Sequence, residues 1–178
     1  IESLPFVNKT DSSFLCQETF LKILPAIIEK NFSLFSEGLT TIQDFMGKLF
    51  YVPHGNSYFS SKEVGKLLKW LENNFETSVG QSSWGPTGFA FFESNELAVK
   101  AFGKQSLGLA EGGVDMLWLE TFSDIKELKA ALEGSMQTGL PIVATMSFDT
   151  AGKTMMGVSP HEFVSFIKNQ HNVFAYGA

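Results

Sequence analysis

The sequence contains no arginine: all thirteen basic residues are lysines, and nineteen acidic residues bring the net charge to −6. Arginine is the residue best suited to paired hydrogen bonds with phosphate and guanine. A net negative chain without arginine is a poor match for nucleic acid or for an anionic membrane. We therefore expect neither of these as a partner, and a small molecule remains the candidate ligand.

Cysteine is almost as scarce, since Cys16 is the only one in 178 residues. A single cysteine cannot form an internal disulfide, which favours a cytoplasmic location. Cys16 lies in the apolar stretch FLCQETFLKILPAII, where a small buried hydrophobic residue is expected. No apolar run is long enough to cross a membrane, and the first residues lack the order of a signal peptide. Because the chain does not start with methionine, we expect an excised or processed piece.

Apolar residues, in contrast, are plentiful, and at 44% hydrophobic the chain can bury a core as one domain or two small ones. The first half shows helical spacing of apolar residues in several segments, with a kink or break at Pro25. These segments are 14–31, 33–49, 62–75 and 94–113. A polar, glycine-rich turn is predicted over 77–88, followed by a short buried strand over 89–92.

The second half alternates short apolar strands with helices. Strands are predicted over 114–120, 140–148 and 173–178, and helices over 123–139 and from Ser159 onward, where Pro160 occupies the first helical position. Nearly continuous apolar strands separated by helices are typical of a parallel sheet. The predicted fold class is α/β, with a helical or α+β N-terminal half. The strand at 89–92 either joins the parallel sheet or forms a separate one.

Functional residues in a parallel α/β sheet lie where strands end and loops begin. Glu120 and Thr121 close the first of these strands, and Ser147, Phe148 and Asp149 close the second. A carboxylate at such a strand end is well placed to hold a ligand ammonium group. Alternatively, Glu120 caps the next helix or makes a structural salt bridge.

Residues 108–178 resemble the homocysteine S-methyltransferase family through EGGVDMLWLET, LPIVATMSFDTAGKTMMGVSP and VFAYGA. The resemblance implies part of a (β/α)₈ barrel and transfer of a methyl group to the sulfur of homocysteine. It also implies that Glu120 helps to hold the substrate amino group and that the loop after Phe148 faces the same pocket. In that family a zinc ion bound by three cysteines turns the substrate thiol into a thiolate.

The zinc ligands are where this sequence departs from the resembled family. The first family cysteine would follow the strand VFAYGA, but the sequence ends at Ala178, and Cys16 lies in no matching motif. We therefore expect no zinc cofactor in this chain, because one cysteine cannot supply three thiolates. His161 and His171 flank a predicted helix at positions too far apart to form a metal site, and we expect both on the surface.

A second resemblance comes from the loop GQSSWGPTG, which contains Gly80, Gln81, Ser82, Ser83, Trp84 and Gly85. Such a loop can present backbone N–H groups to an anion, although it lacks the GK[ST] ending of a P-loop, and an ordinary turn is the alternative. With the preceding helices, residues 1–100 resemble the C-terminal domain of the GHMP-kinase superfamily, near beta-ribofuranosylaminobenzene 5′-phosphate synthase. That resemblance implies phosphoribosyl transfer to an aromatic acid.

The two resemblances predict a GHMP-like region over 1–102 and a partial methyltransferase-like region over 103–178. Three hypotheses follow. The first is a homocysteine S-methyltransferase-like protein that is inactive as this chain alone because the zinc-binding cysteines are absent. The second is a GHMP-type glycosyltransferase fragment, and the third is a non-catalytic chimera or fragment. Any activity would be that of a transferase. A partial barrel leaves sheet edges unpaired, so an oligomer or a partner chain is expected to cover them.

Overall fold

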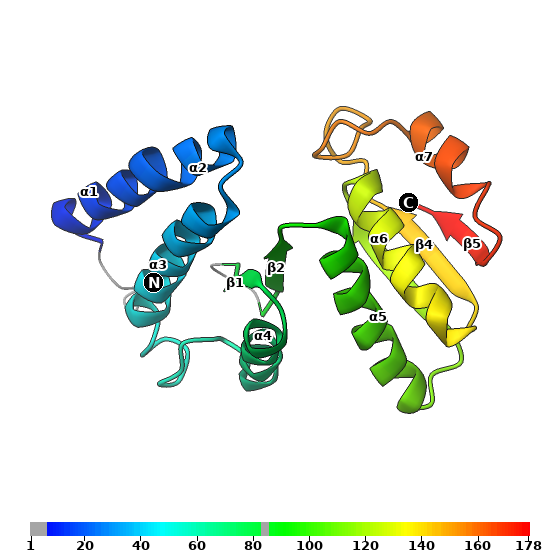
Figure 1. Ribbon diagram of the computed structural model, residues 1–178, viewed down its shortest axis with the longest axis horizontal. Helices are drawn as coiled ribbons and strands as arrows, with labels where there is room; N and C mark the ends of the chain where they lie inside the picture. The colour runs from blue at the N-terminus through cyan, green and yellow to red at the C-terminus, as the bar shows by residue number, and fades with distance from the viewer. Residues whose placement is uncertain (1–6, 83–85) are drawn as a thin grey trace. The chain divides into compact units, whose positions relative to one another are not determined.

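The computed structural model describes residues 7–82 and 86–178, which form two compact units (Figure 1). The N-terminal unit ends at Glu93 and the C-terminal unit begins at Ser94. This division lies N-terminal to the predicted boundary between 102 and 103. Within the described residues, no helix is both long and apolar enough to cross a membrane.

The N-terminal unit is mainly helical, as its apolar spacing predicts. Its helices are α1 (Lys9–Glu18), the π-helix η1 (Thr19–Ile23), α2 (Leu24–Glu29), α3 (Phe32–Leu49) and α4 (Lys62–Asn74). Asn31 and Ser61 act as N-caps, because their side chains accept hydrogen bonds from the N–H groups of Leu34 and Val64.

Pro25 does not break the first helical segment in two. The chain instead widens into η1 just before it, and the N–H of Leu24 donates to the carbonyl of Thr19. Proline has no N–H, and in a regular α-helix its ring clashes with the carbonyl four residues earlier. The π-helical turn places Pro25 in the first turn of α2, where both defects are tolerated.

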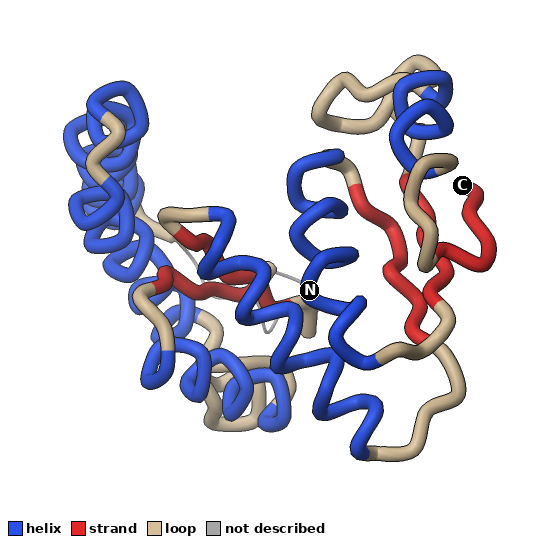
Figure 2. Tube along the Cα trace, turned by 45° about the vertical axis from the view of Figure 1, so that its right-hand side comes forward, coloured by secondary structure: helices blue, strands red, loops and turns tan. Residues whose placement is uncertain are grey.

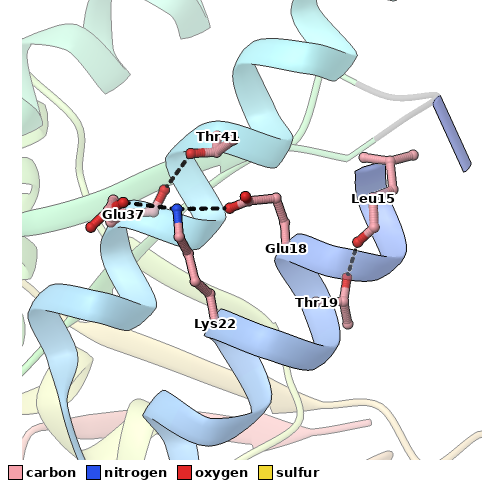
Figure 3. A network of polar contacts seen from close by, with 6 residues as sticks. All are labelled: Leu15, Glu18, Thr19, Lys22, Glu37 and Thr41. Carbon is pink, nitrogen blue, oxygen red and sulfur yellow. Dashed lines mark hydrogen bonds and ion pairs between the residues drawn. The ribbon is translucent and has the colours of Figure 1, made fainter. Parts of the chain in front are cut away.

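Lys22 connects this segment to α3 (Figure 3). Its Nζ lies 3.1 Å from a carboxylate oxygen of Glu18 and 2.8 Å from one of Glu37. Hydrogen bonds to Glu37 and then Glu18 raise the pKa of Lys22. Because these side chains remain partly exposed, the pairs orient the helices more than they stabilise them.

Two antiparallel strands complete the N-terminal unit, β1 (Thr77–Gln81) and β2 (Gly88–Phe92), and they form a sheet of their own. The prediction of a turn beginning at 77 is therefore wrong, because Thr77 to Gln81 pair with β2. The predicted strand at 89–92 is confirmed by β2, but its predicted burial is wrong, since Phe91 is exposed. Phe91 packs edge-on against Phe35 of α3, with ring centroids 5.4 Å apart.

The C-terminal unit confirms the predicted α/β class, with a three-stranded parallel sheet in the order β3-β4-β5. Its elements are α5 (Asn95–Glu111), β3 (Leu117–Phe122), α6 (Ile125–Ser135), the 3₁₀-helix η2 (Met136–Thr138), β4 (Ile142–Met146), α7 (Pro160–Ile167) and β5 (Val173–Gly177). Ser159 caps α7 and Pro160 opens it, as predicted. The three strands are drawn in red in Figure 2.

The core of this unit lies between one face of the sheet and two helices. Leu117, Ile142, Ala144 and Met146 from the strands meet Leu128 and Leu132 of α6 and Phe163 and Ile167 of α7. Both helices contact the same strand residues, so they cover the same face, and α6 lies across β4 in Figure 1. Trp118 is on the other face and is 61% exposed.

Helices α5 and α6 approach each other closely through small residues. A Cβ atom added at Gly134 would lie 2.6 Å from the backbone nitrogen of Gly103 and 2.7 Å from the carbonyl oxygen of Val99. One turn along, the buried hydroxyls of Ser106 and Ser135 share a hydrogen bond of 2.9 Å. This contact requires glycine at 134, because a side chain there would meet backbone that cannot move aside.

Cys16 is exposed on α1, which contradicts its predicted burial. The local sequence is apolar, but α1 buries none of its residues. An apolar stretch predicts which residues can be buried, whereas burial itself requires a neighbouring element over that helix face.

Candidate functional site

Strand β3 contains one residue more than β4 across the same length of sheet. Leu119 pairs with Ala144 and Phe122 pairs with Met146, so Glu120 and Thr121 together lie opposite Thr145. This is a β-bulge at the carboxyl end of a parallel strand, where such sheets place ligands. Both residues predicted from the first strand end therefore belong to one irregular feature.

The bulge changes which side of the sheet each residue faces. Leu117 and Leu119 pack toward the core, and regular alternation would turn Phe122 away from it. The extra residue brings Phe122 back against the core and next to Phe102, with ring centroids 6.2 Å apart. Glu120 faces away from the core, as Trp118 does, and the bulge leaves Thr121 exposed as well.

Thr121 adopts a backbone conformation that is unfavourable for its type, with a φ angle of 65°. A β-branched residue in this left-handed region is uncommon and costs energy. The N–H of Thr121 donates to Oγ1 of Thr145 at 3.2 Å, so the hydroxyl of β4 replaces a ladder partner lost at the bulge. Thr145 was not among the predicted site residues, and nothing in the sequence marks a threonine inside an apolar strand as a bulge partner.

The Glu120 carboxylate has no structural role within residues 7–82 and 86–178. It makes no hydrogen bond or ion pair there, and helix α6 is capped by Asp124, whose Oδ1 accepts from the N–H of Lys126 at 3.1 Å. The alternatives of a helix cap and a structural salt bridge are thus excluded among the described residues. Glu120 remains an exposed carboxylate available to a ligand.

The residues at the end of β4 lie in three different environments. Ser147 continues the sheet, with its N–H donating to the carbonyl of Phe122 at 3.1 Å. Phe148 packs against the core, its ring centroid 6.1 Å from that of Phe163. Asp149 is exposed and accepts a 3.3 Å hydrogen bond from the hydroxyl of Thr150. Of these three predicted site residues, Asp149 offers a charged group to solvent.

The loop between β4 and α7 is stabilised by hydrogen bonds among its own residues. Thr154 is buried, its N–H donates to the carbonyl of Val158 at 2.9 Å, and its hydroxyl accepts from the N–H of Val158 at 3.1 Å. The loop ends at the capping box of α7, where Glu162 accepts from the hydroxyl of Ser159 at 2.6 Å. This hydrogen bond, together with one from the Ser159 N–H, lowers the pKa of Glu162. The loop is therefore held in shape at both ends.

The second predicted site is only partly within the described residues, since Ser83, Trp84 and Gly85 lie outside them. The N–H of Gln81 donates to Oε1 of Gln43 at 3.0 Å, and the N–H of Ser82 donates to the carbonyl of Thr87 at 3.0 Å. These two amides are thus already engaged and are not free for an anion. Gly80 is buried, and with Gln81 it lines a cavity of about 320 Å³ between α3, α4 and β1.

Zinc does not fit the side chains that the structure describes. Residues 7–82 and 86–178 contain no group of three or more histidine, cysteine, aspartate and glutamate side chains able to hold a metal ion. Cys16 lies on α1 of the other unit, and His161 and His171 are exposed, as predicted for surface residues.

Comparison with known proteins identifies a family for most of the chain. The family model described as homocysteine S-methyltransferase matches residues 61–178, which include α4, β1, β2 and the whole C-terminal unit. No curated protein and no solved structure matches the chain. The match confirms the first resemblance and begins earlier in the chain than residue 108. The second resemblance, over residues 1–100, stays a prediction.

Proposed function

Because the chain belongs to the homocysteine S-methyltransferase family, we propose that its C-terminal unit binds homocysteine at the carboxyl edge of β3 and β4. The substrate is an amino acid with an ammonium, a carboxylate and a thiol. The family reaction moves a methyl group from a methyl donor to the sulfur, so that the donor's bond to the methyl group breaks, the S–C bond forms and the thiol proton leaves. The described residues are proposed to hold and orient this substrate.

The observation that carries the proposal is the unpartnered carboxylate of Glu120 at the bulge. A carboxylate accepts strong, charge-assisted hydrogen bonds from an ammonium group. Glu120 lies at the strand end on the side that faces away from the core, so it can meet a ligand without desolvating a buried charge. Asp149 follows β4 at the same edge and adds negative charge that favours the ammonium end of the substrate.

Methyl transfer also needs a deprotonated thiol, and the described residues offer no metal group that would supply one. The proposal for this chain is therefore substrate binding of the methyltransferase type. Phosphoribosyl transfer has less support, because the amides of Gln81 and Ser82 are engaged within the protein. A folded protein that binds neither substrate would be the non-catalytic fragment.

The test is a calorimetric titration of L-homocysteine, under reducing conditions, into the wild-type chain and Glu120→Gln. Loss of a charged hydrogen bond predicts affinity weaker by about 10- to 100-fold. Glu111→Gln is the matched control, because Glu111 is an exposed glutamate at the end of α5 and should leave affinity unchanged.

A second titration uses 4-mercaptobutanoate, which is homocysteine without its ammonium group. The wild-type chain and Glu120→Gln should bind this analogue equally weakly, since it has no ammonium group to contact the side chain at position 120. Equal affinity of the two proteins for homocysteine itself would overturn the assignment of Glu120.

A further inference from the structure

The geometry of the bulge points to Thr145 as a positioning residue, and we propose that its hydroxyl fixes the direction of Glu120. The proposal rests on the function proposed above and goes beyond it, because Thr145 touches no reacting atom. Its Oγ1 accepts the N–H of Thr121, the residue next to Glu120, at 3.2 Å. Through this bond β4 determines the backbone path on which the Glu120 carboxylate is carried.

The bulge needs such a support because its backbone is unfavourable. Thr121 has a φ angle of 65°, a conformation that threonine adopts only when its surroundings hold it there. At a bulge the ladder is interrupted, so the N–H of the extra residue loses its carbonyl partner. The Thr145 hydroxyl restores a partner to that N–H and thereby stabilises the bulge backbone that carries Glu120.

Thr145 is itself held rigidly. It lies in β4 between Ala144 and Met146, which are buried in the core of the unit. A β-branched side chain in a strand has a restricted χ1 angle, so its hydroxyl keeps one direction. The support for the bulge is thus anchored in the most buried strand of the sheet.

The experiment measures L-homocysteine affinity by calorimetry for Thr145→Val and Thr145→Ser, each alone and combined with Glu120→Gln. Valine keeps the shape and removes the acceptor, and we expect affinity about fivefold weaker. Serine keeps the hydroxyl, and affinity should stay within about twofold of wild type. In the Glu120→Gln background, Thr145→Val should cause no further loss, because the residue it positions is already disabled.

Urea unfolding of every variant measures stability separately from affinity. If Thr145 had a purely structural role, its replacement would weaken homocysteine binding equally in the wild-type and Glu120→Gln backgrounds. Thr145→Ala, which also removes the acceptor, is the second variant if valine disturbs the strand. Weakening by Glu120→Gln but not by Thr145→Val or Thr145→Ala would overturn this inference and leave the proposed function intact. Equal losses of affinity on replacing Thr145 in the wild-type and Glu120→Gln backgrounds would also overturn this inference and leave the proposed function intact. No weakening by Glu120→Gln would overturn both.

Discussion

The two units differ in how they use their apolar residues. Residues 1–93 contain twelve of the eighteen phenylalanines, yet among the residues of this unit that the structure describes only three apolar ones are buried, namely Ala26, Leu68 and Val79. The C-terminal unit has half as many phenylalanines and buries eleven apolar residues. A supply of large apolar side chains therefore does not by itself produce a core; elements must cover one another.

The reason lies in the architecture of each unit. In the C-terminal unit one sheet face is covered by α6 and α7, so strand residues are enclosed from two sides. In the N-terminal unit aromatic rings meet as edge-on pairs, such as Phe75 with Phe92 at 5.9 Å, and remain partly exposed. Helices α1 and α2 with η1 also leave Phe20, Leu21, Leu24, Ile27 and Ile28 exposed. The candidate site belongs to the better-packed unit.

The largest expected effect compares the same truncation in both units. Leu132 and Leu68 are 1% and 2% exposed, but Leu132 belongs to the eight-residue buried cluster of the C-terminal unit. Leu132→Ala should lower the free energy of unfolding by about 2–5 kcal/mol. Leu68→Ala should lower it by about 2 kcal/mol, near the lower end of this range. Hydrogen exchange followed by mass spectrometry measures protection in β4 and β1 separately. Loss of β4 protection in Leu68→Ala would show that the units unfold together.

The next effect compares two glycines at helix contacts. Alanine at 134 would meet the backbone of α5, and we expect destabilisation of about 1–3 kcal/mol. Alanine at 38 would meet Cγ1 of Ile23 at 2.8 Å, a side-chain atom that can move aside, while helix propensity improves by up to about 1 kcal/mol. Thermal unfolding of Gly134→Ala and Gly38→Ala checks this order. A larger loss at 38 would mean that η1 is as rigid as α5.

The smallest effect compares two capping boxes. Ser159→Ala should cost about 1 kcal/mol, because α7 contributes Phe163 and Ile167 to the core. Asn8→Ala removes the matching cap of α1, which buries no residue, and should fray that helix without changing global unfolding. Urea unfolding and exchange at α1 amides measure both. If Ser159→Ala and Asn8→Ala lowered the free energy of global unfolding equally, the expected difference between the two caps would be contradicted.

The Ser159 cap also predicts a pH dependence. Its hydrogen bonds hold the pKa of Glu162 below the ordinary value of 4.5, so this contribution to stability is present above pH 4.5. It is lost as the pH falls through the lower pKa of the folded state. The difference in unfolding free energy between wild type and Ser159→Ala should therefore narrow in acid. A constant difference from neutral pH to below pH 4 would argue against this linkage.

The sequence predicts most of the fold where signals are local. Ser159, Pro160 and Glu162 specify the start of α7 within a few residues, and short apolar runs between helices predict the parallel sheet. Predictions fail where a contact between residues distant in the sequence determines the local structure. Strand β1 reads as a turn because Gly80 and Ser78 obscure its alternation, and only pairing with β2 makes it a strand. Helix α6 is capped by Asp124 and starts at Ile125, two residues after the predicted start at 123.

The same distinction holds for the candidate site. The position of Glu120 at a strand end follows from the sequence, whereas the bulge and the role of Thr145 do not. They depend on Phe122 packing against the core, which is a property of the assembled unit. Phe148 shows the converse, because its place after a strand suggests a ligand contact while its ring packs on Phe163.

The extra residue in β3 makes the strand end, but not the core, sensitive to chain length. Up to Leu119 the odd-numbered positions face the helices, and from Phe122 the even-numbered ones do. Loss of one codon at 120 or 121 would remove the bulge and restore regular alternation, and Phe122 would still face the core because it would take the next inward position after Leu119. A deletion here would therefore spare the core and reshape the strand end that carries the candidate site, whereas a substitution acts on one side chain. A chain shortened by this residue should accordingly keep its fold while losing the left-handed backbone conformation found at Thr121.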